Sequence, residues 1–438
     1  VRRRRISIRK ARLTLPCTQA GLRKVPHDTH QEDSLKKRLS LIALAALFAA
    51  PATPAAEVKA PEAPVKLEIY GMILANNYWN SSGVVGSDVP LWAVSGTDPR
   101  AGDKEIGMTA RQSRFGLRLK APDVGSAKLG AVLEFDFFGS LPNGGQKASF
   151  GQARVRLANL KLDWKNASFT AGQDWIILAP LNPTTLGHFA VVGLAASGNV
   201  WLRYPQLRVE ATGKRGEAKL GVTAGLLRPV GGSDPSEAGA FIDTAGAGER
   251  SGLPFVQARA FYARPMRGKT LGVGLSAHYG QESYKFGTTA ITKDETTTWA
   301  AAADFQAPLG DALSVQGELF AGTNLDSFQG GVNQGVVTND AAATATAIDA
   351  KGGWVQASFT PPGHKKLSFH LAYGIDNPDD DALKAGQRAK NSTLMASVFY
   401  KATANFQWAL EYSRLSTEYR LGETNDASIL NLAFAFSF

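Results

Sequence analysis

Apolar and polar residues alternate one by one along much of the chain beyond residue 65. The stretch RFGLRLK (114–120) places Arg or Lys between apolar or small residues, and KLGAVLEFDFFG (128–139) and NFQWALEYS (405–413) follow the same rule. Successive side chains of a β-strand point to opposite faces, so this alternation predicts strands with one apolar and one polar face.

Sixteen segments share this alternation, which bears on the architecture. They are 66–78, 114–120, 128–139, 152–162, 167–175, 203–211, 218–227, 254–263, 270–279, 297–308, 312–322, 352–360, 365–374, 392–401, 405–413 and 427–438. An even number of strands is expected of a membrane barrel whose two chain ends lie on the same side.

The connections between these segments alternate in length. Short ones are 121–127, 163–167, 265–269, 308–311 and 361–365, and long ones are 80–108, 139–151, 176–200, 228–253, 280–296, 323–351, 375–391 and 419–427. Short turns on one side and long loops on the other are typical of a transmembrane β-barrel. A soluble β-sandwich shows the same local alternation but has no reason to sort its loops this way. The predicted fold class is therefore all-β, a 16-stranded antiparallel transmembrane β-barrel over residues 66–438.

The apolar face of the predicted strands suits lipid. It uses Phe, Leu, Val and Ala, and aromatic residues recur near strand ends, as in an interfacial girdle: Tyr78, Trp79, Trp175, Tyr262, Tyr279, Trp299, Tyr400 and Tyr412. Beyond residue 56 no stretch approaches the run of about 18 apolar residues that a transmembrane helix requires.

Net charge sits almost entirely in the first 56 residues. The whole chain has a formal charge of +10, but residues 1–56 hold twelve Lys or Arg and three Asp or Glu, which leaves 36 basic and 35 acidic residues. The remainder is near neutral, so the basic character does not indicate a nucleic-acid partner.

The basic N-terminal segment has the pattern of a leader. Lys36, Lys37 and Arg38 precede the apolar run 39–50, and APA (50–52) and TPA (53–55) fit small-x-small cleavage sites. We interpret residues 1–56 as a cleaved leader that contains a secretory signal peptide (36–56). Our hypothesis for residues 1–35 is that they arise from an upstream start codon. Residues 57–65 form a short linker. The single cysteine, Cys17, falls in the leader, so disulfides and cysteine-based sites are excluded from the exported part.

Four stretches carry a family resemblance. TARQSRFGLRLKAP (109–122), LEFDFFG (133–139), FTAGQDWIIL (169–178) and LRYPQLRVE (202–210), with the terminal Phe438, resemble in order and spacing the Gram-negative outer-membrane porins, most of all the DcaP-like porin group. The resemblance implies a 16-stranded homotrimer that passes small anionic solutes. It also implies that the terminal Phe438 is read by the barrel assembly machinery.

Arginines gather on the first half of the predicted barrel. They are Arg111, Arg114, Arg118, Arg154, Arg156, Arg203 and Arg208, and strand parity turns Arg114, Arg118, Arg154, Arg156 and Arg208 toward the interior together with Glu134 and Asp136. One hypothesis is a solute-facing basic ladder, because rings of Arg or Lys favour anions in pores. The other is that the arginines pair with Glu134, Asp136, Asp174 and Glu210 and only brace the wall.

The long connection 177–200 contains no Lys, Arg, Asp or Glu. Such a segment fits better against the inner wall than in water, so we predict a constriction loop that includes Pro180, Asn182, Thr184 and His188. The alternative is an extracellular or subunit-contact loop. His188 either contacts solute or is simply packed.

The remaining motifs carry little chemistry. DNPDDDAL (376–383) is oxygen-rich, but its spacing fits no EF-hand, so a solvated outer loop is the simpler interpretation. No nucleophile elbow, HExxH motif or phosphate-cradling loop is present.

The sequence as a whole predicts a non-enzymatic outer-membrane porin for passive diffusion of small hydrophilic solutes, with anions as candidates. Its expected partners are outer-membrane lipid and lipopolysaccharide, two further copies of the chain, the assembly machinery and the solutes, with no nucleic acid. The alternatives are a barrel enzyme such as a lipid hydrolase and a soluble periplasmic β-rich binding protein. In the last strand, NLAFAFSF (431–438), Leu432, Phe434, Phe436 and Phe438 are expected to face lipid.

Overall fold

The computed structural model of the chain describes residues 64–139, 151–230, 245–287 and 291–438. The predicted leader (1–56) and nearly all of the predicted linker (57–65) lie outside these residues.

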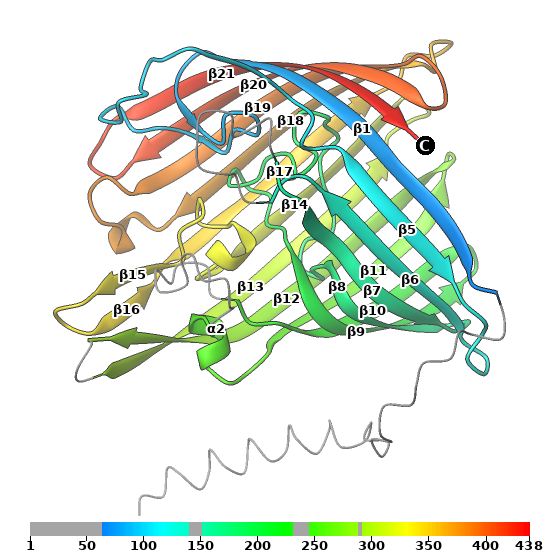
Figure 1. The fold of residues 1–438 in the computed structure, drawn as a ribbon, viewed down its shortest axis with the longest axis horizontal. Helices are drawn as coiled ribbons and strands as arrows, with labels where there is room; N and C mark the ends of the chain where they lie inside the picture. The colour runs from blue at the N-terminus through cyan, green and yellow to red at the C-terminus, as the bar shows by residue number, and fades with distance from the viewer. Residues whose placement is uncertain (1–63, 140–150, 231–244, 288–290) are drawn as a thin grey trace, which may run out of the picture. The chain divides into compact units, whose positions relative to one another are not determined.

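Sixteen antiparallel wall strands, which we call staves and in which β4 and β5 together count as one, form one closed sheet. Their bounds are β1 Lys66–Asn80, β4 Glu105–Thr109 with β5 Arg114–Lys120, β6 Lys128–Asp136, β7 Arg154–Asp163, β8 Ala167–Trp175, β9 Arg203–Arg215, β10 Ala218–Leu227, β11 Phe255–Met266, β12 Lys269–Phe286, β13 Thr292–Pro308, β14 Leu313–Thr323, β17 Asp349–Phe359, β18 Leu367–Pro378, β19 Arg388–Lys401, β20 Phe406–Tyr419 and β21 Thr424–Ser437. Each stave pairs with its neighbours in chain order, and β1 pairs with β21 on one side and with β4 and β5 on the other (Figure 1). The predicted 16-stranded antiparallel barrel is confirmed.

Two features of the staves differ from the prediction. The second stave is interrupted between β4 and β5, and β4 lies inside the connection 80–108 that was expected to be a loop. Several staves are also longer at the end opposite the short turns, so that β12 runs to Phe286 and β20 to Tyr419. Near Phe286 the strand sequence is QESYKF, and alternation fails there because polar residues occupy both faces.

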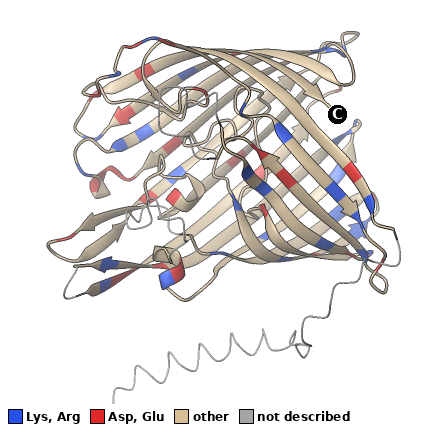
Figure 2. Cartoon of the chain, viewed as in Figure 1, with Lys and Arg blue, Asp and Glu red and all other residues tan. Residues whose placement is uncertain are grey.

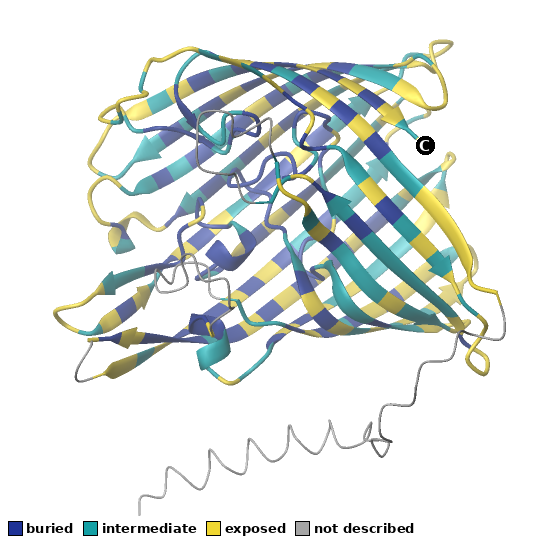
Figure 3. Ribbon diagram, viewed as in Figure 1, coloured by how far each residue is buried: buried dark blue, intermediate teal, exposed yellow. Residues whose placement is uncertain are grey.

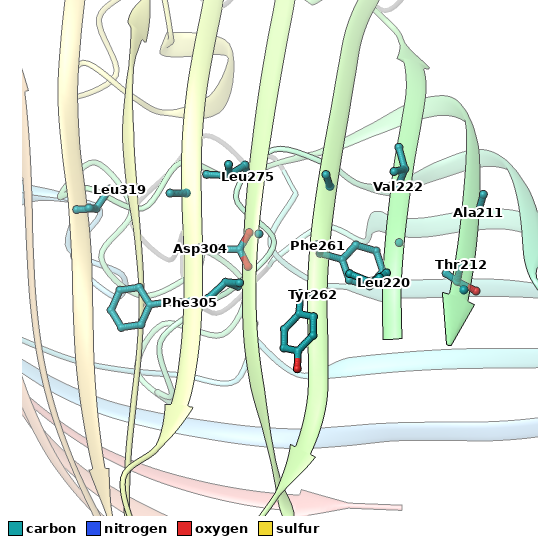
Figure 4. Close-up of a pocket in the computed structure, with 16 residues that line it drawn as sticks. Ala211, Thr212, Leu220, Val222, Phe261, Tyr262, Leu275, Asp304, Phe305 and Leu319 are labelled. Carbon is teal, nitrogen blue, oxygen red and sulfur yellow. The ribbon is translucent and has the colours of Figure 1, made fainter. Parts of the chain in front are cut away.

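The outer face of the barrel is apolar, and buried and exposed residues alternate along the staves (Figure 3). Leu275 and Leu319 are 69% and 62% exposed. Figure 4 shows Leu319, Leu275 and Val222 on the alternate strands β14, β12 and β10, around an apolar hollow of about 910 Å³ in the wall of β9–β14. Aromatic Tyr279 and Trp299 face each other across β12 and β13, where they are also exposed. A continuous outer apolar band without an unpaired sheet edge is compatible with a lipid environment.

The chain end closes the ring. Phe438 and Gly71 of β1 exchange backbone hydrogen bonds of 3.0 and 3.1 Å, and the outward residues of β21 end in Phe434, Phe436 and Phe438. Ala433 and Ala435 face inward and are buried. The last strand therefore alternates as its sequence predicted.

The barrel ends differ in their connections. The short turns gather at what we call the turn end, and the long connections gather at the loop end, where they carry the small sheets β2 (Val84–Val85) with β3 (Trp92–Ala93) and β15 (Val336–Asn339) with β16 (Thr344–Ala347). The helices within the described residues are α2 (Ala247–Arg250), η3 (Asp326–Phe328) and η4 (Asp380–Ala382). In the described ranges no helix is long and apolar enough to cross a membrane.

Candidate functional site: the barrel lumen

Residues 177–200, the lumen segment, leave the end of β8 and lie against inward-facing side chains around the barrel (Figure 1). Because the segment has no regular strand or helix along its length, its backbone N–H groups need partners from elsewhere. The barrel wall supplies those partners.

Five polar side chains of the wall accept hydrogen bonds from the segment at near-regular spacing. Gln257 of β11 accepts from the N–H groups of residues 177 and 178 at 2.8 and 3.0 Å, and Glu318 of β14 from residue 181 at 2.6 Å. Gln356 of β17 accepts from residue 184 at 2.7 Å, and Glu411 of β20 from residues 186 and 187 at 2.8 Å each. Gln112, between β4 and β5, accepts from residues 189 and 190 at 2.8 and 2.9 Å.

These anchors explain how an irregular segment can stay buried. All five side chains are at most 3% exposed, and each offers an oxygen at a point where a backbone donor would otherwise be unsatisfied. These anchors were not predicted from the sequence. Each anchor is a single inward-facing Gln or Glu. In the sequence it cannot be distinguished from any other polar residue that faces the lumen.

Apolar contacts hold the rest of the segment. Leu186 and Phe189 pack against Met72, Leu74 and Phe399 on the inner wall. At the far end Gly198, with φ +98°, lies so close to β17 and β18 that an added Cβ would be 2.1 Å from the Gly353 carbonyl oxygen. Only glycine fits this backbone approach.

The predicted constriction residues all belong to this segment. Pro180 and Thr184 are exposed, although Thr184 Oγ1 accepts from Gln356 Nε2 at 3.2 Å, and the Asn182 carbonyl accepts from Gln316 Nε2 at 3.0 Å. The His188 N–H donates to Thr185 Oγ1 at 3.1 Å. Surrounding protein lowers the pKa of His188 to about 4, and the carboxylate of Asp88 opposes this shift. His188 is therefore neutral at ordinary pH.

The predicted interior arginines meet carboxylates. Arg156 is 1% exposed and binds Glu134 and Asp136 at 2.8 Å each, and Arg154 binds Asp136 through two bonds of 3.0 and 2.6 Å. Both guanidinium groups also reach the carbonyl of Ala190, at 3.4 and 2.9 Å. The ion pairs thus brace the wall and also hold the lumen segment.

Arg114 and Arg203 complete what we call the arginine cluster, defined as Arg114, Arg154, Arg156 and Arg203. Arg114 donates to the Phe189 carbonyl at 3.3 Å and lies 4.1 Å from the centre of that ring. Arg203 lies 4.6 Å from the Trp175 ring centre. Side chains of Arg114 and Arg154 remain 21% and 29% exposed, so both can meet a solute.

The other predicted arginines lie apart from this cluster. Arg208 pairs with Asp174 at 2.6 Å, and Arg118 pairs with Glu68 at 2.7 Å nearer the turn end. Arg111 pairs with Asp88 at 2.6 Å in the loop-end half of the barrel.

A cavity of about 530 Å³ extends from the lumen segment toward the turn end. Its walls include Arg114, His188, His370, Lys365, Lys366 and Lys401, and none of the described residues that line it is an Asp or Glu. Figure 2 shows where basic and acidic residues lie on the ribbon. Because the lining is basic and polar, the cavity suits a hydrated anion better than a cation.

A second connection also folds inward, which the sequence analysis did not predict. Phe328 of η3 is fully buried, and the Asp376 carboxylate of β18 accepts from the N–H groups of Gly331 and Val332 at 3.2 and 3.0 Å. Asp376 was expected in a solvated acidic loop. It is 1% exposed because it anchors this connection, whereas Asp380 and Asp381 are exposed. Among the described residues no cluster of His, Asp and Glu could hold a metal ion.

Solved structures share the fold of this chain. The outer membrane channel DcaP of Acinetobacter baumannii matches with a TM-score of 0.65 and 17% identity over 86% of this chain and 99% of that one. An anion-selective porin from Comamonas acidovorans matches with a TM-score of 0.51 and 12% identity over 86% and 100%, and OprB of Pseudomonas putida with 0.54 and 11% over 85% and 94%. No family model and no curated protein sequence matches the chain. The chain therefore has the porin barrel fold.

Proposed function

We propose that this protein is an outer-membrane porin of a Gram-negative cell through which small hydrophilic solutes diffuse passively. The observation that carries this function is a closed 16-stranded barrel with an apolar exterior and a polar interior that is narrowed by its own lumen segment. A barrel of this strand number encloses a water-filled lumen, and a closed sheet leaves no unsatisfied edge in lipid.

The chemistry of the lumen supports a preference for small anions. Arg114 and Arg154 keep exposed guanidinium surface, and the adjoining cavity has Lys365, Lys366 and Lys401 in its wall. Arginine stays charged at any working pH and can bind carboxylate or phosphate through two parallel bonds. The predicted solute-facing residues thus act alongside their bracing role, and the lumen segment sets the size limit.

The proposal includes the expected partners. Outer-membrane lipid and lipopolysaccharide would surround the exposed apolar staves, three copies would associate, and the barrel assembly machinery would read Phe438. A barrel enzyme and a soluble binding protein remain the alternatives that the experiment must separate.

Planar-bilayer recording of the purified protein in a KCl gradient tests the proposal. We expect discrete channels whose reversal potential has the sign of anion preference, reduced in Arg114→Gln but not in Arg414→Gln, an exposed arginine paired with Asp426 at 2.8 Å. Protein recovered without detergent, or a detergent-purified protein that forms no channels, would contradict the function.

A further inference from the structure

Lysines line the turn-end mouth of the barrel. One lies near the turn end of each of seven staves, and together they form what we call the lysine arc: Lys66 (β1), Lys120 (β5), Lys128 (β6), Lys161 (β7), Lys214 (β9), Lys219 (β10) and Lys401 (β19). Strand parity places six of them on the same face as buried interior residues, as with Lys401 two positions after buried Phe399, and the register shift between β6 and β7 does the same for Lys161. The arc therefore points into the lumen and not toward lipid headgroups.

Most of the arc has no ion-pair partner among the described residues, although Lys128 lies directly opposite Asp163. Lys161 pairs with Asp163 at 2.9 Å and Lys219 with Glu210 at 3.1 Å. Within the part of the chain that the structure describes, no ion pair joins the other five lysines to a carboxylate. This distinguishes the arc from the arginine cluster, where Asp136 and Glu134 sit between the guanidinium groups.

Cross-strand pairing makes the arrangement costly. Lys66 lies directly opposite Lys120, and Lys214 directly opposite Lys219. Like charges that face each other across strands destabilise a sheet. At the loop end Lys285 also lies directly opposite Lys293, but there both side chains face outward, so among these opposed pairs only those at the turn end place repelling charge in the lumen.

The loop end has the opposite arrangement. Four lysines lie near the loop ends of described staves, Lys285, Lys293, Lys351 and Lys390, and their parity turns all of them outward. The charge of the lysines that face the lumen is therefore concentrated at one mouth, beside the cavity that Lys365, Lys366 and Lys401 line.

We propose that the lysine arc makes the channel rectify, so that small anions enter the lumen more readily from the turn end than from the loop end. This inference rests on the proposed porin function. Fixed positive charge raises the anion concentration at the turn mouth. A voltage that drives anions inward from the turn mouth raises the ion concentration in the lumen, whereas the opposite voltage lowers it.

Salt provides the first test, because it screens the arc without any mutation. The screening length is about 10 Å at 0.1 M salt and about 3 Å at 1 M. In single channels at equal and opposite voltages, we expect the ratio of the two currents to exceed about 1.5 at 0.1 M KCl and to approach about 1 at 1 M, as mouth charge becomes screened.

The second test removes charge from the arc. Lys66→Gln, Lys120→Gln and Lys214→Gln combined should bring the current ratio at 0.1 M close to unity. The matched control combines Lys285→Gln, Lys293→Gln and Lys351→Gln, which lie outward at the loop end, and should keep the wild-type ratio. A shift in gel mobility on boiling verifies that each variant is folded.

Channel orientation fixes the sign of the effect. In a Cys17→Ser background, Asp311→Cys places one thiol in the exposed turn between β13 and β14, where a bulky membrane-impermeant reagent identifies the chamber that the turn end faces. The larger current must be the one that drives chloride from that chamber inward. Symmetric wild-type currents would overturn rectification, and a ratio unchanged in the triple variant would overturn its assignment to the lysine arc. Either result would leave the porin function standing. Absence of channels would overturn both.

Discussion

At the scale of single residues, the ion pairs of Arg156 have a large energetic consequence. Its guanidinium binds two carboxylates, Glu134 and the fully buried Asp136, so Arg156→Gln removes the closest partner of Glu134 and one of the two arginine partners of Asp136. Loss of the sole partner from a buried pair costs about 3–5 kcal/mol, and Arg114 and Arg154, which keep their bonds to these carboxylates, lower that cost here. We expect Arg156→Gln to unfold at a markedly lower temperature than wild type. On gels, this is the temperature at which the band moves to the position of the boiled protein. Arg118→Gln, which breaks an exposed pair, is the control and should change stability by about 1 kcal/mol or less. Equal shifts in both variants would contradict this assignment.

His188 predicts a pH dependence with a definite sign. Its pKa is about 4 in the folded protein against 6.5 in the unfolded chain, so the unfolded state takes up a proton first as the pH falls. The folded state is therefore unaffected above pH 6.5 and loses stability progressively down to about pH 4. Thermal unfolding in detergent should show a smaller decrease over this range in His188→Gln than in wild type. His364→Gln, at an exposed histidine in a turn, should behave like wild type.

Residue types on the interior could be predicted from sequence, but their partners could not. Parity alone turned Arg154 and Arg156 inward together with Glu134 and Asp136. Which arginine meets which carboxylate depends on the register between β6 and β7, and that register shifts between Glu134 and Phe135. Such an irregularity leaves no mark in a pattern of alternating residues.

At the scale of elements, the lumen segment depends on a close backbone contact at Gly198. An added Cβ would lie 2.1 Å from the Gly353 carbonyl oxygen, and the positive φ is unfavourable for alanine. Gly198→Ala should displace the segment from β17 and β18 and raise the spread of single-channel conductance without abolishing the barrel. Gly310→Ala, in a turn where an added Cβ meets nothing, is the control. A variant with wild-type conductance and noise would show that this contact does not hold the segment.

Elements were predictable where one face met lipid and the other met water. The sixteen staves follow from that contrast, whereas the loop-end extensions of β12 and β20 do not, because both of their faces are polar or covered by connections. β4 has an exposed apolar face in Ile106 and Met108, but it is only five residues long and follows a long connection. The absence of charge in residues 177–200 indicated an inward loop. Its anchors at Gln112, Gln257 and Gln356 required knowledge of which staves lie across the lumen.

At the scale of the whole molecule, the ring must close and the chain must also be assembled, and Phe438 contributes to both. Its backbone N–H and carbonyl bond to Gly71, and its ring lies where a Cβ on Gly71 would be 2.7 Å from its Cζ atom. Phe438→Ala keeps the backbone hydrogen bonds to Gly71 and removes only the ring. Gly71→Val places a side chain in the space that the Phe438 ring occupies. We therefore expect Gly71→Val to lower refolding in detergent, because closure itself is obstructed.

Phe438→Ala separates closure from recognition. If the assembly machinery reads the ring, this variant should refold in detergent like wild type yet yield much less heat-modifiable barrel in cells. Phe436→Ala is a matched control, since Phe436 is 47% exposed on the same outward face and stacks on Phe438 at 6.4 Å between ring centres. Equal losses in cells for the two variants would mean that the ring contributes only apolar surface. Normal yield for both would show that ring closure through Gly71 is the whole role of the chain end.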